Sequence, residues 1–248
     1  MTASETRVYL LDVEGTVAPL SLVTEQLFPY ARRHFHEFLK ENIKDPDVRA
    51  DLMLLAVENR AETAPDLPRR LPKVAWTGFV DSFKFQLDAL IYLLWLMDRD
   101  RKSTALKSLQ GKIWKTGFER GKLKGTLFPD VAEAFVHWAT TGKVAIYSSG
   151  SVEAQQLLFR YSTYGDLTPL ISGYFDTRTG AKAERASYAA IAAHFGVAPS
   201  EVLFFSDAVR ELDAACDAGC GTRLVIREGN APVEEAHGHT AISDLASL

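Results

Sequence analysis

The chain has 248 residues, of which 47% are hydrophobic and 24% are charged, a composition that excludes an intrinsically disordered chain. Its 28 Lys and Arg stand against 32 Asp and Glu, giving a formal net charge of −4 without any block of basic residues. We therefore expect no binding to nucleic acid or to an anionic membrane. The longest apolar run, residues 89–97, is well short of the roughly 18 residues that cross a bilayer.

The N-terminal sequence MTASETRVYLLDVEG lacks the basic stretch, apolar stretch and small-residue cleavage site of a secretory signal. The two cysteines, Cys216 and Cys220, are four positions apart. We expect them on one helix, as small buried residues rather than as a disulfide framework. These features predict a cytoplasmic protein with one core.

Four short stretches of almost entirely apolar residues predict the buried strands of a parallel sheet. They are residues 8–11, 144–147, 202–205 and 223–226. Each of the last three follows a helical pattern, so the sequence predicts a doubly wound α/β sheet with helices on both faces. Ligands of such sheets bind beyond the carboxyl ends of the strands, and the residues that follow each strand are therefore the candidates for chemistry.

A long insertion separates the first two predicted strands, and residues 22–125 show helical periodicity only. We expect residues 1–20 and 126–248 to form the catalytic core and residues 21–125 an all-helical cap over the strand ends. An apolar stripe with helical spacing consists of Phe79, Phe83, Leu87, Leu90, Leu94 and Met97. Trp76, Phe79 and Phe83 either line a substrate pocket or form plain core, which is the more common role of aromatic residues at helical spacing.

Two carboxylates follow the first predicted strand, in residues 12–16, DVEGT. Asp12 and Glu14 project to the same side of a sheet, and Gly15 permits a tight bend. One interpretation is a solvated strand end or helix cap. The other is a nucleophilic carboxylate, able to form an aspartyl phosphate, with an acid/base partner beside it.

Hydroxyl groups follow the second predicted strand, where Ser148 and Ser149 precede a helix expected from about Val152. Hydroxyls and free backbone N–H groups at a helix start bind anions, although a serine N-cap without a ligand has the same sequence. Lys182 lies before the third predicted strand. It either neutralises phosphate oxygens together with Asp12 or is an exposed lysine at a helix start.

Asp207 ends the third predicted strand and would face Asp12 across the sheet. Carboxylates in this arrangement suit Mg²⁺, a hard ion that prefers oxygen ligands. Glu211 either supports this site or is a charge favoured by a helix N-terminus. Phosphoryl transfer depends on positioning and charge neutralisation. The sequence therefore predicts a phosphoryl-transfer site made of five groups: a nucleophilic carboxylate, an acid/base carboxylate, the two serine hydroxyls, a lysine and a metal-binding aspartate.

The order of these motifs resembles that of the haloacid dehalogenase superfamily and, within it, the enolase-phosphatase family of methionine salvage. The matching segments are DVEGT at 12–16, YSSGSVEAQ at 147–155, FDTRTGAKAERASY at 175–188, SD at 206–207 and ELDAA at 211–215. The likeness spans essentially the whole chain, and its long motifs are specific. One departure is Phe118, which stands where the family pattern has tyrosine.

The resemblance implies a haloacid dehalogenase-like Rossmannoid core with an inserted all-helical cap, and a Mg²⁺-dependent phosphoric monoester hydrolase with enolase activity. Such an enzyme enolises 2,3-diketo-5-methylthiopentyl 1-phosphate. It then removes the phosphate through an aspartyl-phosphate intermediate, leaving the acireductone 1,2-dihydroxy-3-keto-5-methylthiopentene. We expect a monomer with one Mg²⁺ per subunit and this phosphorylated diketone as its small-molecule partner.

The resemblance also implies roles for individual residues. The metal ligands are Asp12, the backbone carbonyl of Glu14, and Asp207; the substrate-binding residues are Ser148, Ser149 and Lys182. Asp12 is the nucleophile and Glu14 the acid/base group. Two residues are candidates for the base that removes the carbon-bound proton. Glu14 is the first, and Lys182, which would have to be neutral, is the second. Two other functions remain: a simple phosphatase for sugar or nucleotide monophosphates, and a catalytically silent, metal-stabilised binding protein.

Overall fold

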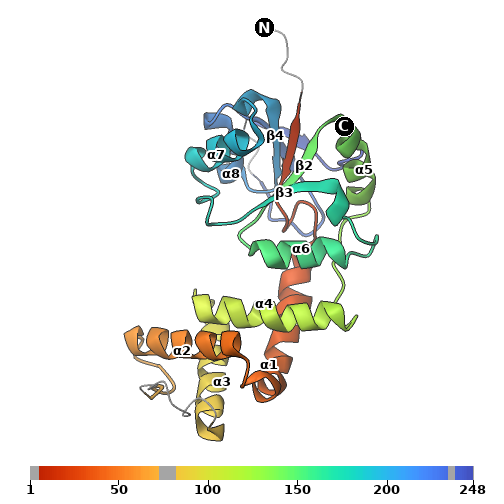
Figure 1. Cartoon of the computed structure of the whole chain (residues 1–248). Coiled ribbons are helices and arrows are strands. Elements are labelled where there is room, and N and C mark those ends of the chain that lie inside the picture. Colours follow the sequence, from red (N-terminus) through yellow and green to blue (C-terminus); the bar gives the residue numbers. More distant parts are fainter. Residues whose placement is uncertain (1–5, 73–81, 234–237, 248) are drawn as a thin grey trace. The chain divides into compact units, whose positions relative to one another are not determined.

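The computed structural model describes residues 6–72, 82–233 and 238–247. The chain divides into two compact units, Met1–Thr24 with Gly121–Leu248 and Glu25–Arg120 (Figure 1). The expected boundaries at residues 20 and 126, and the role of the insertion as a cap, stay predictions. Among the described residues, no helix is long and apolar enough to span a membrane.

The first unit is built on a six-stranded sheet with the strand order β3-β2-β1-β4-β5-β6, in which every pairing is parallel. The strands are β1 (Val8–Leu11), β2 (Lys143–Tyr147), β3 (Ile171–Phe175), β4 (Val202–Ser206), β5 (Gly221–Val225) and β6 (Thr240–Ile242). In β1, Leu11 pairs with Ile146 on one side and with Phe205 on the other. The chain adds β2 and β3 on one side of β1 and then β4 to β6 on the other, so the strand order reverses beside β1. This confirms the predicted doubly wound parallel sheet.

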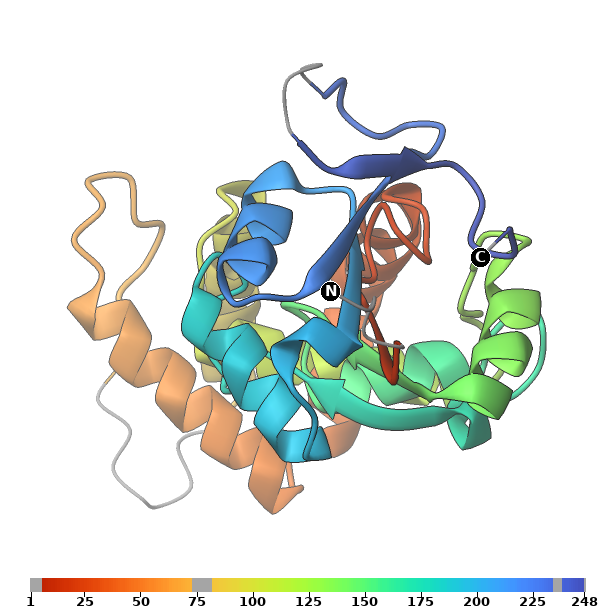
Figure 2. The same ribbon diagram turned by 90° about the horizontal axis from the view of Figure 1, so that it is seen from above.

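Helices cover both faces of this sheet (Figure 2). On one face lie α5 (Val131–Thr141) and α6 (Val152–Arg160), and on the other α7 (Arg185–Phe195) and α8 (Val209–Asp217). The alternation of side chains along β1 explains the two layers. Tyr9 stacks on Trp138 of α5 with ring centroids 4.7 Å apart. Leu10 is instead part of the buried cluster that includes Ile191 of α7 and Leu212 of α8. Two short 3₁₀ turns, η3 (Thr168–Leu170) and η4 (Pro199–Glu201), precede β3 and β4.

The predicted strands at 8–11, 144–147 and 202–205 are confirmed, the last two extended by one residue each. The fourth is displaced: β5 begins at Gly221 and ends at Val225, leaving Ile226 outside the strand and 48% exposed. Strands β3 and β6 were not predicted. The sequence of β3, ISGYF, is interrupted by Ser172 and Gly173, and β6 has three residues at the edge of the sheet.

The second unit contains α1 (Phe28–Asn42), α2 (Pro46–Ala61), α3 (Phe83–Asp98) and α4 (Thr104–Glu119). A π-helical turn, η1 (Leu22–Leu27), leads into α1. In the described part of this unit all regular elements are helices, as predicted. The starts of α2, α3 and α4 are capped by the side chains of Asp45, Ser82 and Ser103, whereas α1 has no side-chain cap. At the start of α4, Glu58 of α2 also accepts hydrogen bonds from the hydroxyl of Ser103 at 2.5 Å and from the backbone N–H of Thr104 at 3.0 Å.

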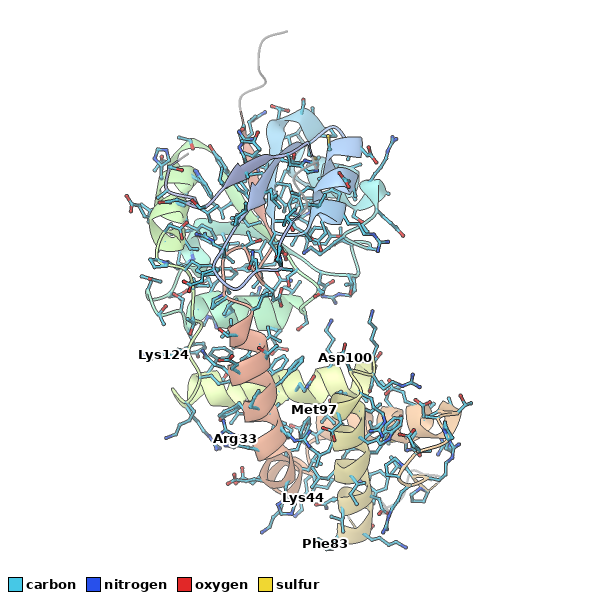
Figure 3. The ribbon with its side chains drawn as sticks, turned by 180° about the vertical axis from the view of Figure 1, so that it is seen from behind. Arg33, Lys44, Phe83, Met97, Asp100 and Lys124 are labelled. Atoms are coloured by element: carbon cyan, nitrogen blue, oxygen red, sulfur yellow. The ribbon has the colours of Figure 1, made fainter. Side chains whose placement is uncertain are left out.

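Helix α3, which Figure 3 marks near its two ends with Phe83 and Met97, confirms the predicted helix but not its predicted apolar face. The side chain of Phe83 is 73% exposed. The buried face is formed by Phe85, Ala89, Tyr92, Leu93, Trp95 and Leu96, together with Asp88, which pairs with Arg69 at 2.9 Å. The helix is apolar on most sides, so spacing alone could not select the packed face. Trp76 and Phe79 lie outside the described residues. Phe118 is buried in α4.

The two cysteines do not share a helix, contrary to the prediction. Helix α8 ends at Asp217, so Cys216 lies in its last turn and is exposed, whereas Cys220 follows the helix and is buried. Both thiols are free. The burial of Cys220 agrees with the prediction that both cysteines are buried, whereas the exposure of Cys216 does not.

Candidate active site

Three of the predicted site residues follow three adjacent strands, Asp12 after β1, Ser148 after β2 and Asp207 after β4. Sheet-like hydrogen bonds continue past the strand ends. The backbone N–H of Asp12 donates to the carbonyl of Phe205 at 2.9 Å, and that of Ser148 donates to the carbonyl of Phe175 at 3.1 Å. The strand order reverses between β1 and β4, which is where open α/β sheets bind ligands. Asp12 and Asp207 flank that point.

Lys182 joins this group from the loop before α7. Its ammonium nitrogen lies 2.5 Å from Asp12 Oδ1 and 2.7 Å from Glu211 Oε2. The Lys182 side chain is 12% exposed, so it is not a surface lysine. Burial lowers the pKa of Lys182, but the charges of Asp12 and Glu211 outweigh burial and raise the pKa above its usual value. The amine is therefore held in its charged form.

Glu211 is oriented as well as paired. Its Oε2 accepts a hydrogen bond from the Ser206 hydroxyl at 3.0 Å, in addition to the contact with Lys182. Burial and the nearby charge of Asp12 raise the pKa of Glu211. Glu184, which is close to Lys182 in the sequence, is exposed and lies immediately before α7. The partners of Lys182 are thus Asp12 and Glu211.

Glu14 contacts the serine that follows β2. The Ser148 hydroxyl donates to Glu14 Oε2 at 3.2 Å and accepts a hydrogen bond from the backbone N–H of Gly150 at 3.1 Å. Burial, and after it the charge of Asp12, raise the pKa of the Glu14 carboxyl. Ser149 is exposed next to Ser148, and α6 begins three residues later at Val152. Hydroxyls at the start of a helix are a typical anion-binding arrangement.

Asp207 lies against the loop that carries Asp12. Gly15 has φ +75°, and a Cβ atom at this position would lie 2.2 Å from Asp207 Oδ2. Burial and the charges of Asp12 and Glu211 raise the pKa of Asp207 to about 6. Within the described ranges, no three His, Cys, Asp or Glu side chains are grouped as metal ligands. The available oxygen donors are the carboxylates of Asp12 and Asp207 and the backbone carbonyls of the loop.

Two residues that sequence reasoning missed bind this loop from the segment after β5. The Arg227 guanidinium donates to the carbonyl of Thr16 at 3.1 Å and to Asp130 Oδ2 at 2.8 Å. The Asn230 side-chain amide donates to the carbonyl of Gly15 at 2.9 Å. The available sequence signal was the Gly-Asn pair at 229–230, a turn signal directly after a strand. Both residues immobilise the backbone beside Asp12 and Glu14.

Comparisons with known proteins identify the family of this chain. A model of the haloacid dehalogenase-like hydrolase family matches residues 6–219. The chain is also 54% identical over 226 residues, 91% of its length, to a protein of Synechococcus elongatus named "Enolase-phosphatase E1", 90% of which is covered. The chain belongs to the enolase-phosphatase family of haloacid dehalogenase-like hydrolases.

Two further proteins are similar to this chain over nearly its whole length. The crystal structure of the UTR4 protein of Saccharomyces cerevisiae is 34% identical, with a TM-score of 0.78, and the match covers 98% of this chain and 100% of that one. A protein of Physcomitrium patens is 40% identical over 248 residues, 99% of this chain and 49% of the relative. It is named "Probable bifunctional methylthioribulose-1-phosphate dehydratase/enolase-phosphatase E1". In that relative the region matched here is therefore joined to a second activity.

Proposed function

We propose that the chain is the acireductone synthase of methionine salvage, a phosphatase that also acts as an enolase. It converts 2,3-diketo-5-methylthiopentyl 1-phosphate into 1,2-dihydroxy-3-keto-5-methylthiopentene and phosphate. The 54% identity to an enolase-phosphatase over 90% of that relative carries this conclusion. The dehydratase named in the Physcomitrium patens relative supports it, because loss of water from methylthioribulose 1-phosphate yields this diketone phosphate.

Phosphate removal is assigned to Asp12. Its carboxylate attacks phosphorus in line, forming an aspartyl phosphate while the bond to the enol oxygen breaks. The Lys182 ammonium, 2.5 Å from Asp12, offsets the negative charge of the phosphate oxygens at the point of attack. Ser148 and Ser149, at the start of α6, bind the same phosphate group.

Mg²⁺ is the metal that suits the oxygen donors at this site, because it binds through one or two carboxylates plus substrate phosphate and keeps several waters. Asp12, Asp207 and the backbone carbonyl of Glu14 would hold it. The crowding of carboxylates at the site supports this assignment. Asp12 and Glu211 both pair with Lys182, and burial together with the charges of Asp12 and Glu211 raises the pKa of Asp207 to about 6. When bound, the ion supplies positive charge that neutralises phosphate oxygens.

Glu14 is assigned the proton transfers. It protonates the leaving enol oxygen and then takes a proton from the water that hydrolyses the aspartyl phosphate. For enolisation we also assign Glu14 as the carbon base. Lys182 is disfavoured in that role, because its two carboxylate partners keep the amine charged. Burial raises the pKa of the Glu14 carboxyl, which makes this carboxyl easier to protonate than an exposed one, as both of its assigned roles require.

A stopped assay on the diketone phosphate, with and without Mg²⁺, tests the proposal. Ultraviolet absorbance follows the enol while released phosphate is counted. We expect both signals, and both to require Mg²⁺. Turnover of generic phosphate esters without enol from the diketone would leave a plain phosphatase instead, and turnover of no ester would leave a binding protein. The cytoplasmic location and the monomeric state stay predictions.

A further inference from the structure

Three hydroxyl groups bind three consecutive backbone carbonyls in the loop that carries Lys182. The Tyr147 hydroxyl donates to the carbonyl of Gly180 at 2.9 Å, and the Ser187 hydroxyl donates to that of Ala181 at 2.8 Å. The Tyr188 hydroxyl donates to the carbonyl of Lys182 itself at 2.7 Å. Each carbonyl of residues 180–182 therefore has a side-chain donor, and we call these three donors the hydroxyl clamp.

The hydroxyl clamp is built into the core of the first unit. Tyr147 and Tyr188 are fully buried, Ser187 is 2% exposed, and the two tyrosine rings meet edge to face with centroids 5.7 Å apart. The hydroxyls thus hold fixed positions because their side chains are packed. Tyr147 ends β2 and Ser187 and Tyr188 lie in the first turn of α7, so the loop is tied to two rigid elements.

Gly180 shows how closely the loop approaches the clamp. Its φ is +148°, and a Cβ atom there would lie 2.2 Å from the Ser187 hydroxyl oxygen. Only glycine lets the chain pass this hydroxyl in that conformation. Gly180, Ser187 and Tyr188 take no part in the proposed chemistry, but all three contribute to the contacts that hold this loop.

Lys182 needs such support because its ammonium meets two carboxylates from different elements. Asp12 follows β1 and Glu211 lies in α8, and both contacts are 2.7 Å or shorter. A long lysine side chain on an unrestrained loop has many other conformations. We propose that Tyr147, Ser187 and Tyr188 are positioning residues that fix the backbone of residues 180–182, so that the Lys182 ammonium stands between Asp12 and Glu211.

The inference rests on the proposed function in one respect, which is that Lys182 takes part in phosphoryl transfer. The test therefore has two readouts, one that measures this reaction and one that does not depend on it. The first is kcat and KM for phosphate release from the diketone phosphate by Tyr188→Phe. Because small displacements of a catalytic group cost large factors in rate, we expect kcat to fall on the order of tenfold. We expect KM to change less, since the remaining phosphate contacts are intact.

The second readout needs no substrate. Acetic anhydride at limiting concentration labels the lysines of the folded protein, and mass spectrometry compares acetylation of Lys182 with that of the exposed Lys124. We expect Tyr188→Phe to raise the Lys182 to Lys124 labelling ratio by roughly threefold or more, because the loop opens locally. A general loss of stability would raise labelling of all buried groups and lower the midpoint of thermal unfolding instead.

Tyr174→Phe is the matched control. The Tyr174 hydroxyl in β3 is buried and has no hydrogen-bond partner among the described residues, so its loss should leave both readouts at wild-type values. Ser187→Ala and Tyr147→Phe replace Tyr188→Phe if that variant does not fold. A lower kcat with unchanged Lys182 labelling overturns the inference. Wild-type kcat together with wild-type Lys182 labelling in Tyr188→Phe, Ser187→Ala and Tyr147→Phe overturns it as well. If the wild-type protein releases no phosphate from the diketone phosphate, the proposed function is refuted. The labelling result still shows whether the hydroxyl clamp holds Lys182 in place.

Discussion

Lys182 and Asp12 form a buried ion pair, 2.5 Å between Nζ and Oδ1, in which the lysine is 12% exposed and the aspartate 7%. The pair connects the loop before α7 to the residue that follows β1. Removing one partner of such a pair is costly, because the other charge is left buried without compensation.

Lys182→Ala is therefore expected to reduce both stability and activity. Asp12 and Glu211 would face each other without a cation, and the metal-free protein should lose about 3 kcal/mol of its free energy of unfolding. Phosphate release should fall by a factor on the order of 10²–10³. Urea unfolding and a phosphate assay measure the two effects. Lys124→Ala, which removes an exposed lysine, is the control, and equal values for the two variants would return Lys182 to the role of a surface charge.

Gly15→Ala tests whether Asp207 depends on the close approach of the loop. The variant places a methyl group 2.2 Å from Asp207 Oδ2 in a residue with φ +75°. The backbone conformation alone costs about 1–2 kcal/mol. Displacement of Asp207 should in addition weaken Mg²⁺ binding by roughly tenfold.

Gly196→Ala separates those two effects. Gly196 has φ +68°, but among the described residues beyond its own chain neighbours no atom lies within 4 Å of a Cβ placed there. It should lose stability through backbone strain and keep its Mg²⁺ affinity. Calorimetric titration of both variants with Mg²⁺ provides the comparison, and equal affinities would contradict the importance of the Gly15–Asp207 approach.

The parallel sheet could be predicted because its central strands are apolar on both faces. Strands β2, β1 and β4 occupy three adjacent interior positions of the sheet, and apart from Lys143 and Tyr9 their residues are buried. The strands that were missed, β3 and β6, lie at the two edges, where a strand needs fewer apolar residues. Residues such as Asp12 and Asp207 could be placed together because the carboxyl ends of parallel strands share one edge of the sheet.

What holds the site residues could not be predicted, because those contacts join segments far apart in the sequence. Arg227 binds the carbonyl of Thr16 and the carboxylate of Asp130, and no local pattern marks a residue for either contact. The prediction of which face of α3 is packed was wrong for a related reason. A helix with apolar residues on most sides offers several equivalent stripes, and only the neighbouring helices determine that Phe85 is buried while Phe83 is exposed.

Arg227→Ala should destabilise the protein strongly. The Arg227 side chain is 7% exposed, and its guanidinium pairs with Asp130 at 2.8 Å and lies 4.4 Å from the ring centroid of Phe128. Its removal leaves Asp130 without this cation, and we expect a loss of about 3–5 kcal/mol in the free energy of unfolding. Arg227→Lys should recover only part of this, because an ammonium cannot reproduce the forked contacts.

Arg7→Ala provides the comparison for Arg227. Arg7 pairs with Glu201 at 3.4 Å but is 62% exposed, so its loss should cost less than about 1 kcal/mol. Urea unfolding of the three variants gives the order of stability. A small loss for Arg227→Ala, similar to that of Arg7→Ala, would show that the guanidinium does not hold the loop.

The two cysteines should differ in reactivity. Cys216 is exposed, whereas Cys220 is buried and its pKa is raised to about 11, chiefly by burial. At pH 8 the Cys220 thiol therefore stays protonated as well as inaccessible, and thiolates are the reactive species. Titration with a thiol reagent should label Cys216 rapidly in the folded protein and Cys220 after unfolding in urea. Rapid labelling of both at pH 8 would contradict the buried position of Cys220.

Asp12→Asn should separate the two proposed activities. The amide cannot form an aspartyl phosphate, so phosphate release should be abolished. Enolisation uses Glu14 in our assignment, and its carboxylate and the hydrogen bond from Ser148 remain in this variant. Enol should then accumulate without release of phosphate, which ultraviolet absorbance and a phosphate assay detect together.

Glu14→Gln is the reciprocal variant, expected to lose enolisation and to slow phosphate release by about 10²–10⁴-fold, the usual contribution of general acid–base help. The circular dichroism spectrum checks that both variants are folded. Loss of both activities in a folded Asp12→Asn variant that still binds Mg²⁺ in a calorimetric titration would contradict a carbon base separate from Asp12. Normal enolisation by Glu14→Gln would require a different base, and Lys182, held charged by Asp12 and Glu211, could not be that base.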